Sequence, residues 1–187
     1  AGGSIWVVAD HVSGNGGVHA NGGYYSTSQY AGGGGRVLIE AKKSFTLPID
    51  NVTTLGYNGR SNSGKNGSSI VRVGKESTGR DLFVVNPSKK AGYSMLTTII
   101  PENTFSDSGN IFIRNSGVQI EGTHIFDEIF VESGVLKVSQ QMTCSNILID
   151  SSAELRSSDI QCAGNILVRS KSTLLTNGQL SAQQIQV

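Results

Sequence analysis

A short strand-like pattern that recurs through the second half of the chain decides the fold. It first reads Asn110-Ile111-Phe112-Ile113-Arg114 and returns as Glu128-Ile129-Phe130-Val131-Glu132, at 18- or 19-residue steps. Two further copies occupy 146–150 and 165–169, and a partial copy begins at 184. A small polar corner follows each full copy, and then a second apolar run and a third apolar spot appear. The second run has Val118, Leu136, Leu155 and Leu174, and the third spot has Ile125, Met142, Ile160 and Leu180.

Three short strands and three turns per repeat are typical of one coil of a parallel β-helix. A five-residue strand cannot bury its apolar face alone, but stacked coils give each strand hydrogen-bonded neighbours about 4.8 Å away. A helix is excluded because positions i and i+2 are apolar while i+3 and i+4 are polar. The repeat therefore predicts inward columns, of which Ile111, Ile129, Ile147 and Ile166 form one.

The first half shows the same organisation with longer repeats. Strand-like runs at 4–8, 36–40 and 69–73 are offset by 32 and 33 residues, and glycine-dense segments separate them. We predict a single all-β domain over 1–187, a right-handed parallel β-helix of about seven to eight coils. Residues 1–73 form long Gly-rich coils, 74–109 an irregular coil with an insertion at 86–90, and 110–187 regular short coils.

Composition excludes several classes of function. The 187 residues carry a net charge of +1, with scattered Lys and Arg and 24 glycines. No basic face suited to nucleic acid appears, and no apolar run approaches the roughly 18 residues of a membrane span. The chain also opens without the features of a signal peptide, so we expect a mature or excised fragment of a longer chain.

The glycine-rich segments at 2–10, 18–23 and 32–41 carry a resemblance. They look like repeats of large bacterial surface and secreted proteins, which are right-handed parallel β-helices similar in shape to pectate lyases and adhesin passengers. The resemblance implies an extracellular or cell-surface location. It also implies that other segments of the same protein, or neighbouring copies, are the partners. It transfers no catalytic residue, because no matching cluster of acids with Lys and Arg is found.

One outer column places two acids next to each other. Glu132 and Asp150 are one repeat apart, so we expect them about 5 Å apart, between Arg114 and Arg169. The plain interpretation is a solvated salt-bridge ladder. The alternative is a catalytic pair, since retaining glycosidases hold two carboxyl groups at this spacing, or a Ca²⁺ site. Apart from this possible Ca²⁺, the sequence predicts no cofactor or metal.

A second outer column is apolar. If alternate positions point inward, one exposed stripe should run along the molecule through Trp6, Leu38, Phe112, Phe130, Leu148 and Leu167. Soluble proteins seldom leave such a stripe uncovered. We therefore expect an intramolecular cover, a partner, or an exchange of the inward and outward positions in some coils.

The two cysteines are one repeat apart. Cys144 and Cys162 should therefore lie in adjacent coils at a Cα distance compatible with a disulfide. Two free buried thiols fit the same position equally well, and the sequence does not decide between them.

Three hypotheses for function follow. The first is a non-enzymatic structural or adhesive segment of an extracellular surface protein. The second is a carbohydrate-active β-helix that uses Glu132 and Asp150. The third is a carbohydrate-binding module whose sugar platforms are Trp6 and the loop aromatics Tyr24, Tyr25, Tyr30 and Tyr57.

Overall fold

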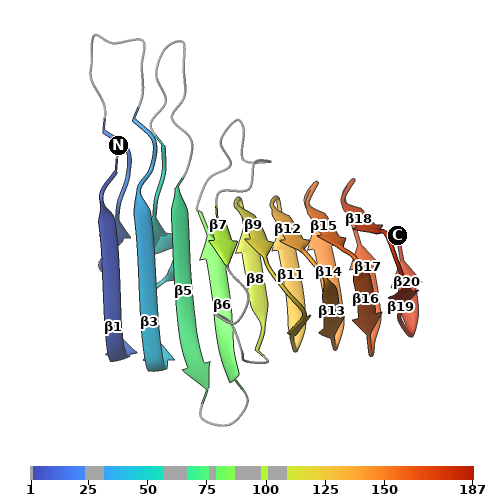
Figure 1. The fold of residues 1–187 in the computed structure, drawn as a ribbon. Helices are drawn as coiled ribbons and strands as arrows, with labels where there is room; N and C mark the ends of the chain where they lie inside the picture. Colours follow the sequence, from blue (N-terminus) through green and yellow to red (C-terminus); the bar gives the residue numbers. More distant parts are fainter. Residues whose placement is uncertain (1, 24–31, 57–66, 76–78, 87–97, 101–108) are drawn as a thin grey trace.

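The computed structural model describes residues 2–23, 32–56, 67–75, 79–86, 98–100 and 109–187 (Figure 1). Its described part is all β apart from a 3₁₀ turn, Ile49–Asn51. The structure holds, in the residues it describes, no helix with the length and apolar character that a membrane crossing requires.

Nine strands form one long sheet, whose stacking order follows the chain (Figure 1). Eight steps of about 4.8 Å give this sheet a width near 38 Å. In stacking order its strands are β1 (Ser4–Val12), β3 (Arg36–Phe45), β5 (Ser68–Lys75), β6 (Gly79–Val85), β8 (Ile111–Arg114), β11 (Glu128–Glu132), β14 (Asn146–Asp150), β17 (Asn165–Val168) and β20 (Gln184–Gln186).

Three smaller sheets pack with the long one. The five-stranded sheet contains β7 (Thr98–Ile100), β9 (Gly117–Ile120), β12 (Val135–Val138), β15 (Glu154–Ser157) and β18 (Thr173–Thr176). The four-stranded sheet contains β10 (His124–Ile125), β13 (Gln141–Cys144), β16 (Asp159–Cys162) and β19 (Leu180–Ser181). The two-stranded sheet contains β2 (Val18–His19) and β4 (Val52–Thr53).

The register confirms the 18- and 19-residue repeat. Ile129 is the Cα partner of both Ile111 and Ile147, and Ile147 is that of Ile166. All four side chains are buried. Of the two long offsets, 32 residues is confirmed for β1 and β3. The predicted 33 is wrong by one residue, because Arg36 pairs with Ser68 and β3 and β5 are therefore also offset by 32. Residues one repeat apart are therefore hydrogen-bonded neighbours.

The prediction for the third apolar column is wrong at one position. The residue paired with Met142 is His124 and not Ile125, which is 62% exposed. His124 is buried, its Nε2 lies 2.7 Å from the Glu121 carbonyl oxygen, and its ring stacks with Phe126. A satisfied histidine takes the inward position here because its neighbours on the chain set the register.

The pair β5–β6 breaks the parallel pattern. All other pairs in the described part of the chain are parallel, whereas β5 and β6 run antiparallel, with Val71 opposite Phe83 and Ile70 opposite Val84. Partners across a ladder lie on the same face of a sheet. Pairing therefore links Val7, Ile39, Val71, Phe83 and Phe112 on what we name the Phe112 face. The opposite, Trp6 face carries Trp6, Leu38, Ile70, Val84 and Ile113.

The buried face consequently changes sides between β5 and β6. On β1, β3 and β5 the Phe112 face is buried, in a core with Val37, Ile39, Val71 and Val52 of the two-stranded sheet. From β6 onward the Trp6 face is buried, in a larger core between the long, five-stranded and four-stranded sheets. The chain has two interiors on opposite sides of one shared sheet.

The corners after the long-sheet strands explain the polar residues of the repeat. Asn115, Ser133, Ser151 and Ser170 all have φ between 49° and 61°. Asn and Ser accept this left-handed turn more readily than bulky residues, because short polar side chains can bond the local backbone. In the first half, close approach of the backbone requires glycine instead, since a Cβ on Gly67 would collide with the Gly35 carbonyl.

Candidate functional site

The predicted outer stripe is divided between two faces. Trp6 and Leu38 lie on the Trp6 face, whereas Phe112, Phe130, Leu148 and Leu167 lie on the Phe112 face. The prediction of a single line is wrong because it assumed one parallel stack, and the antiparallel β5–β6 pair exchanges the faces. The molecule therefore has two separate apolar surfaces.

The first surface is a groove on the Trp6 face of β1, β3 and β5. It has a volume of about 590 Å³, and its floor includes Leu38 and Ile70. Trp6 is 73% exposed at one end, and Ile99 of β7 forms the opposite wall. The Thr98 hydroxyl donates a hydrogen bond to the Ser68 hydroxyl at 2.8 Å, which joins β7 to the floor.

Among the described residues that line the groove, Arg36 is the one that carries a charge. Its side chain lies on the Trp6 face because its Cα partner is Ser68, two positions before Ile70. The described residues include no ion pair to the Arg36 guanidinium, in contrast to Arg72, which bonds Glu40 at 3.2 Å. An acidic group in the groove would find this cation available.

The second surface is an aromatic ladder on the Phe112 face. The ring centroids of Phe83 and Phe112 are 4.6 Å apart, and those of Phe112 and Phe130 are 4.9 Å apart, with planes within 4° of parallel. Leu148 and Leu167 continue the row at half-buried positions. A sugar stacks on the open face of a ring, but both faces of Phe112 are covered by its neighbours. The ladder accordingly suits stability better than glycan binding.

A buried polar network centred on Asn86 joins the two interiors at the end of β6. Asn86, 1% exposed, accepts hydrogen bonds at its side-chain oxygen from the backbone N–H and the hydroxyl of Thr54, at 3.3 and 3.1 Å. Its amide nitrogen donates to the Ser116 hydroxyl at 3.1 Å. Because Thr54 belongs to the first interior and Ser116 to the second, Asn86 connects both.

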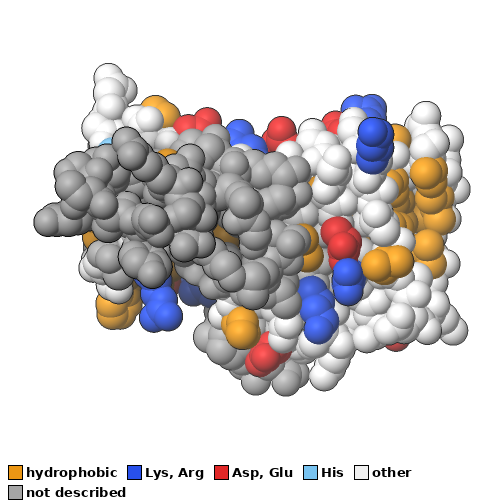
Figure 2. All heavy atoms as spheres, turned by 90° about the horizontal axis from the view of Figure 1, so that it is seen from above, with side chains coloured by type: hydrophobic (Ala, Val, Ile, Leu, Met, Phe, Trp, Pro, Cys, Tyr) orange, Lys and Arg blue, Asp and Glu red, His pale blue; other side chains and the backbone are white. Residues whose placement is uncertain are grey.

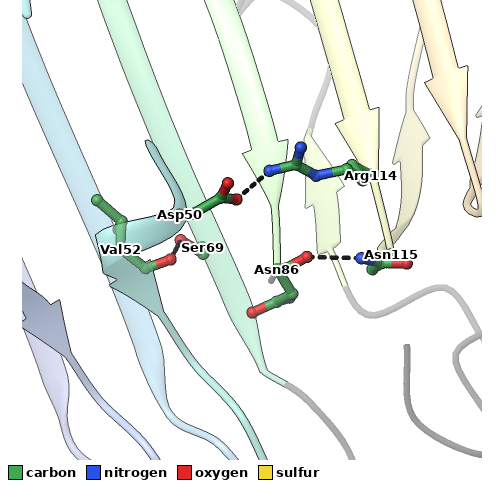
Figure 3. A network of polar contacts seen from close by, with 6 residues as sticks. All are labelled: Asp50, Val52, Ser69, Asn86, Arg114 and Asn115. Atoms are coloured by element: carbon green, nitrogen blue, oxygen red, sulfur yellow. Dashed lines mark hydrogen bonds and ion pairs between the residues drawn. The ribbon is translucent and has the colours of Figure 1, made fainter. Parts of the chain in front are cut away.

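Two further contacts strengthen this junction (Figure 3). The Asn115 side-chain amide donates to the Asn86 carbonyl at 2.8 Å, and Arg114 forms an ion pair with Asp50. The charge ladder of Arg114 with Glu132 is a prediction of the sequence. The Arg114 guanidinium instead reaches across the β5–β6 junction to Asp50, which lies in the 3₁₀ turn directly before β4.

The two candidate acids are adjacent in register, as predicted. Glu132 and Asp150 are Cα partners in β11 and β14. The Asp150 carboxylate, however, is engaged in the corner. A hydrogen bond from the Ser170 side chain, and one from the Ser151 N–H at 2.6 Å, hold the pKa of Asp150 below its usual value. A general acid needs a raised pKa, so this group fits a turn acceptor better than a proton donor.

The two cysteines are also register partners, in β13 and β16. Both are buried free thiols. Burial, together with the neighbouring Cys162, raises the pKa of the Cys144 thiol. A protonated buried thiol is a poor nucleophile, so the pair acts as small apolar packing groups in this state.

Metal ligands do not gather in the described ranges, where no group of three or more His, Cys, Asp or Glu side chains comes together. In the face seen in Figure 2, basic and acidic side chains are interspersed over the part that is described. The loop aromatics Tyr24, Tyr25, Tyr30 and Tyr57 lie outside the described residues.

Sequence reasoning missed three residues of these sites. Asn86 was expected in a protruding loop because Pro87 follows it, and nothing local marks it as buried. Ile70 lies in the predicted strand-like run at 69–73 and Ile99 in the predicted irregular coil, but the place of both in the groove depends on the hairpin between β5 and β6. Comparison of the chain with protein-family models, curated proteins and solved structures finds no match.

Proposed function

We propose that the chain is a non-catalytic β-helical segment that gives rigidity and a contact surface to an extracellular surface protein. The observation that carries the proposal is the register, in which residues 18 or 19 positions apart are partners in parallel pairs from β8 to β20. Such stacking builds a stiff body without any need for a reacting centre.

We propose further that both parts coil in the same, right-handed sense, with about seven to eight coils in all. The hand of a coil depends on the strand direction, the side of the interior and the direction of stacking. Between β5 and β6 the first two reverse together, while the stacking continues, so the hand is conserved. Connections between parallel strands of one sheet are right-handed in about 98% of cases.

The test of the proposal distinguishes a structural segment from an enzyme that cleaves polysaccharides. The purified chain is incubated with polygalacturonate and with neutral polysaccharides, and reducing ends are measured. We expect no release above a heat-denatured sample. Release that disappears in Glu132→Gln or Asp150→Asn, but not in the control Glu128→Gln, would establish a carbohydrate-active protein instead.

A carbohydrate-binding module is the second candidate, and the exposure of Trp6 favours it. An indole that is 73% exposed offers a sugar a stacking face that the Phe112 ladder lacks. A glycan array distinguishes the two functions: specific binding that Trp6→Ala abolishes supports the module, whereas silence supports the structural segment.

The proposed location has its own test. Brief protease treatment of intact cells that produce the chain should release peptides from it. Recovery only after lysis would contradict an extracellular surface protein.

A further inference from the structure

We propose that the groove on the Trp6 face binds an extended segment of a partner polypeptide, which adds a strand to the edge of β7 that no strand in the described part of the chain occupies. The inference deepens the adhesive role proposed above by naming the chemistry of its partner, and it rests on that role.

The fold itself shows what covers this face of the long sheet. From β6 to β17 each strand of the long sheet has a strand of the five-stranded sheet at the same level, and the core lies between them. The five-stranded sheet ends at β7, but the long sheet continues past it with β5, β3 and β1. In the described structure Ile70 and Leu38 thus extend the row of Val84 and Ile113 without a covering strand.

The backbone of β7 offers the next strand a place to pair. Glu121 donates its N–H to the Ile100 carbonyl at 2.9 Å, so the backbone groups of Ile100 face β9. Backbone groups alternate in direction along a strand. The N–H and C=O of Ile99 therefore face away from β9, toward the groove. Added strands recognise such an edge by main-chain hydrogen bonds and the floor by alternate side chains.

The chemistry of the groove defines the segment. A strand added beside β7 would lie over β5, so its inward side chains, two positions apart, would face Ile70 and Ser68 in turn. An apolar residue suits the position over Ile70, and a large one also reaches Leu38, about 4.8 Å further along the stack. Arg36, the Cα partner of Ser68, favours an acidic residue two positions away. A glycan is less well matched, because the floor is aliphatic. Among the described lining residues, a sugar ring could stack only on the indole of Trp6.

A selection experiment identifies the segment from random sequences. A phage-displayed library of random dodecapeptides is selected on the immobilised chain. We expect enriched sequences with an apolar residue and an acidic residue two positions apart. Failure to enrich above a support without protein, or enrichment without this spacing, would overturn the proposal.

The enriched peptide is then synthesised and titrated. Trp6 is the one tryptophan of the chain, so its emission reports on the groove directly, and docking should shift it to shorter wavelength. Ile99→Pro removes one edge N–H without touching a bond to β9, and we expect about tenfold weaker binding. Ile99→Ser also loses the wall side chain but keeps this N–H, so it should bind more tightly than Ile99→Pro, and the difference between the two variants measures the edge hydrogen bond.

Matched variants test the floor and the charge. Leu38→Asp and Arg36→Glu should each weaken binding by about tenfold or more. The controls are Leu148→Asp, on the opposite face, and Arg36→Lys, which should remain close to the parent. Melting temperatures establish that each variant is folded.

Two results would overturn the proposal while leaving the structural role intact. One is peptide binding that Ile99→Pro and Leu38→Asp do not change. The other is an emission shift with polygalacturonate or a neutral oligosaccharide, but with no enriched peptide, which would make the groove a glycan site. Reducing-end release, in contrast, would contradict the proposed function itself.

Discussion

Residues with positive φ turn the chain at the ends of the long-sheet strands, and none of the corner residues from Asn115 to Lys171 that do so is glycine. A non-glycine residue in the left-handed region costs about 1 to 2 kcal/mol, less for Asn. This cost recurs at the corner after each long-sheet strand from β8 to β17, because the left-handed turn places the next strand in register. Side-chain bonds offset part of it, such as that from the Ser133 hydroxyl to the Ser151 carbonyl at 3.1 Å.

Lys171 is the corner residue least suited to its conformation. It is exposed and has φ of 62°. Lys171→Gly should raise the free energy of unfolding by about 0.5 to 1 kcal/mol, because relief of strain exceeds the greater entropy that glycine gives the unfolded chain. Thermal unfolding followed by circular dichroism checks this. Lys171→Ala is the control, and equal stability of the two variants would contradict the explanation.

Asp150 should make stability depend on pH. Its pKa in the fold lies below the unfolded value. The ionised carboxylate therefore stabilises the fold above about pH 4, and this contribution is lost as the pH falls through the folded pKa. Asp150→Asn should lower the melting temperature at pH 7, and the difference from the parent should shrink below about pH 4.

A salt control separates this effect from a surface ion pair. Asp10 also has a lowered pKa, but the cause is Lys43, 3.0 Å away. The effect of Asp10→Asn should diminish in 1 M NaCl, where the screening length is about 3 Å. The hydrogen bonds of Asp150 should persist. Equal sensitivity to salt at both positions would contradict the assignment.

At the scale of elements, the junction between the two interiors depends on Asn86. Asn86→Ala would leave the Thr54 and Ser116 hydroxyls buried without this partner, so unfolding should cost about 2 to 4 kcal/mol less. Asn165→Ala, at an exposed position, should change stability by less than about 0.5 kcal/mol. Urea denaturation measures both. Similar losses in the two variants would show that the network is dispensable.

The strands after residue 110 could be predicted from the sequence, since each repeat supplies its own copy of the pattern. The columns of Ile111 and Val118 follow directly from counting residues. The change of face could not be predicted in this way, because a hairpin reverses the strand and breaks the count. The groove and the Asn86 junction depend on that hairpin, so they could not be predicted from the sequence either.

At the scale of the whole molecule, the two interiors should unfold as separate units. In the described residues the core on the Phe112 face has six buried apolar side chains, and the core on the Trp6 face has 22. Native-state hydrogen exchange should therefore show a lower opening free energy for β1 and β3 than for β11 and β14.

Two core variants test this independence. Ile39→Ala should cost about 2 to 5 kcal/mol and accelerate exchange in β1 and β3 alone. Ile149→Ala should lower protection in β11 and β14 by a similar amount. If Ile39→Ala reduced protection equally in both regions, the chain would be one cooperative unit.

The reversal between β5 and β6 also determines how the molecule can meet its surroundings. Between β5 and β6 both the strand direction and the buried side reverse. The two halves are therefore related by a rotation of about half a turn about the stacking axis. The groove on the Trp6 face and the aromatic ladder on the Phe112 face therefore lie on opposite sides of the long sheet. A ligand in the groove would leave the aromatic ladder free. The long sheet between the two surfaces would hold two bound ligands at a fixed separation.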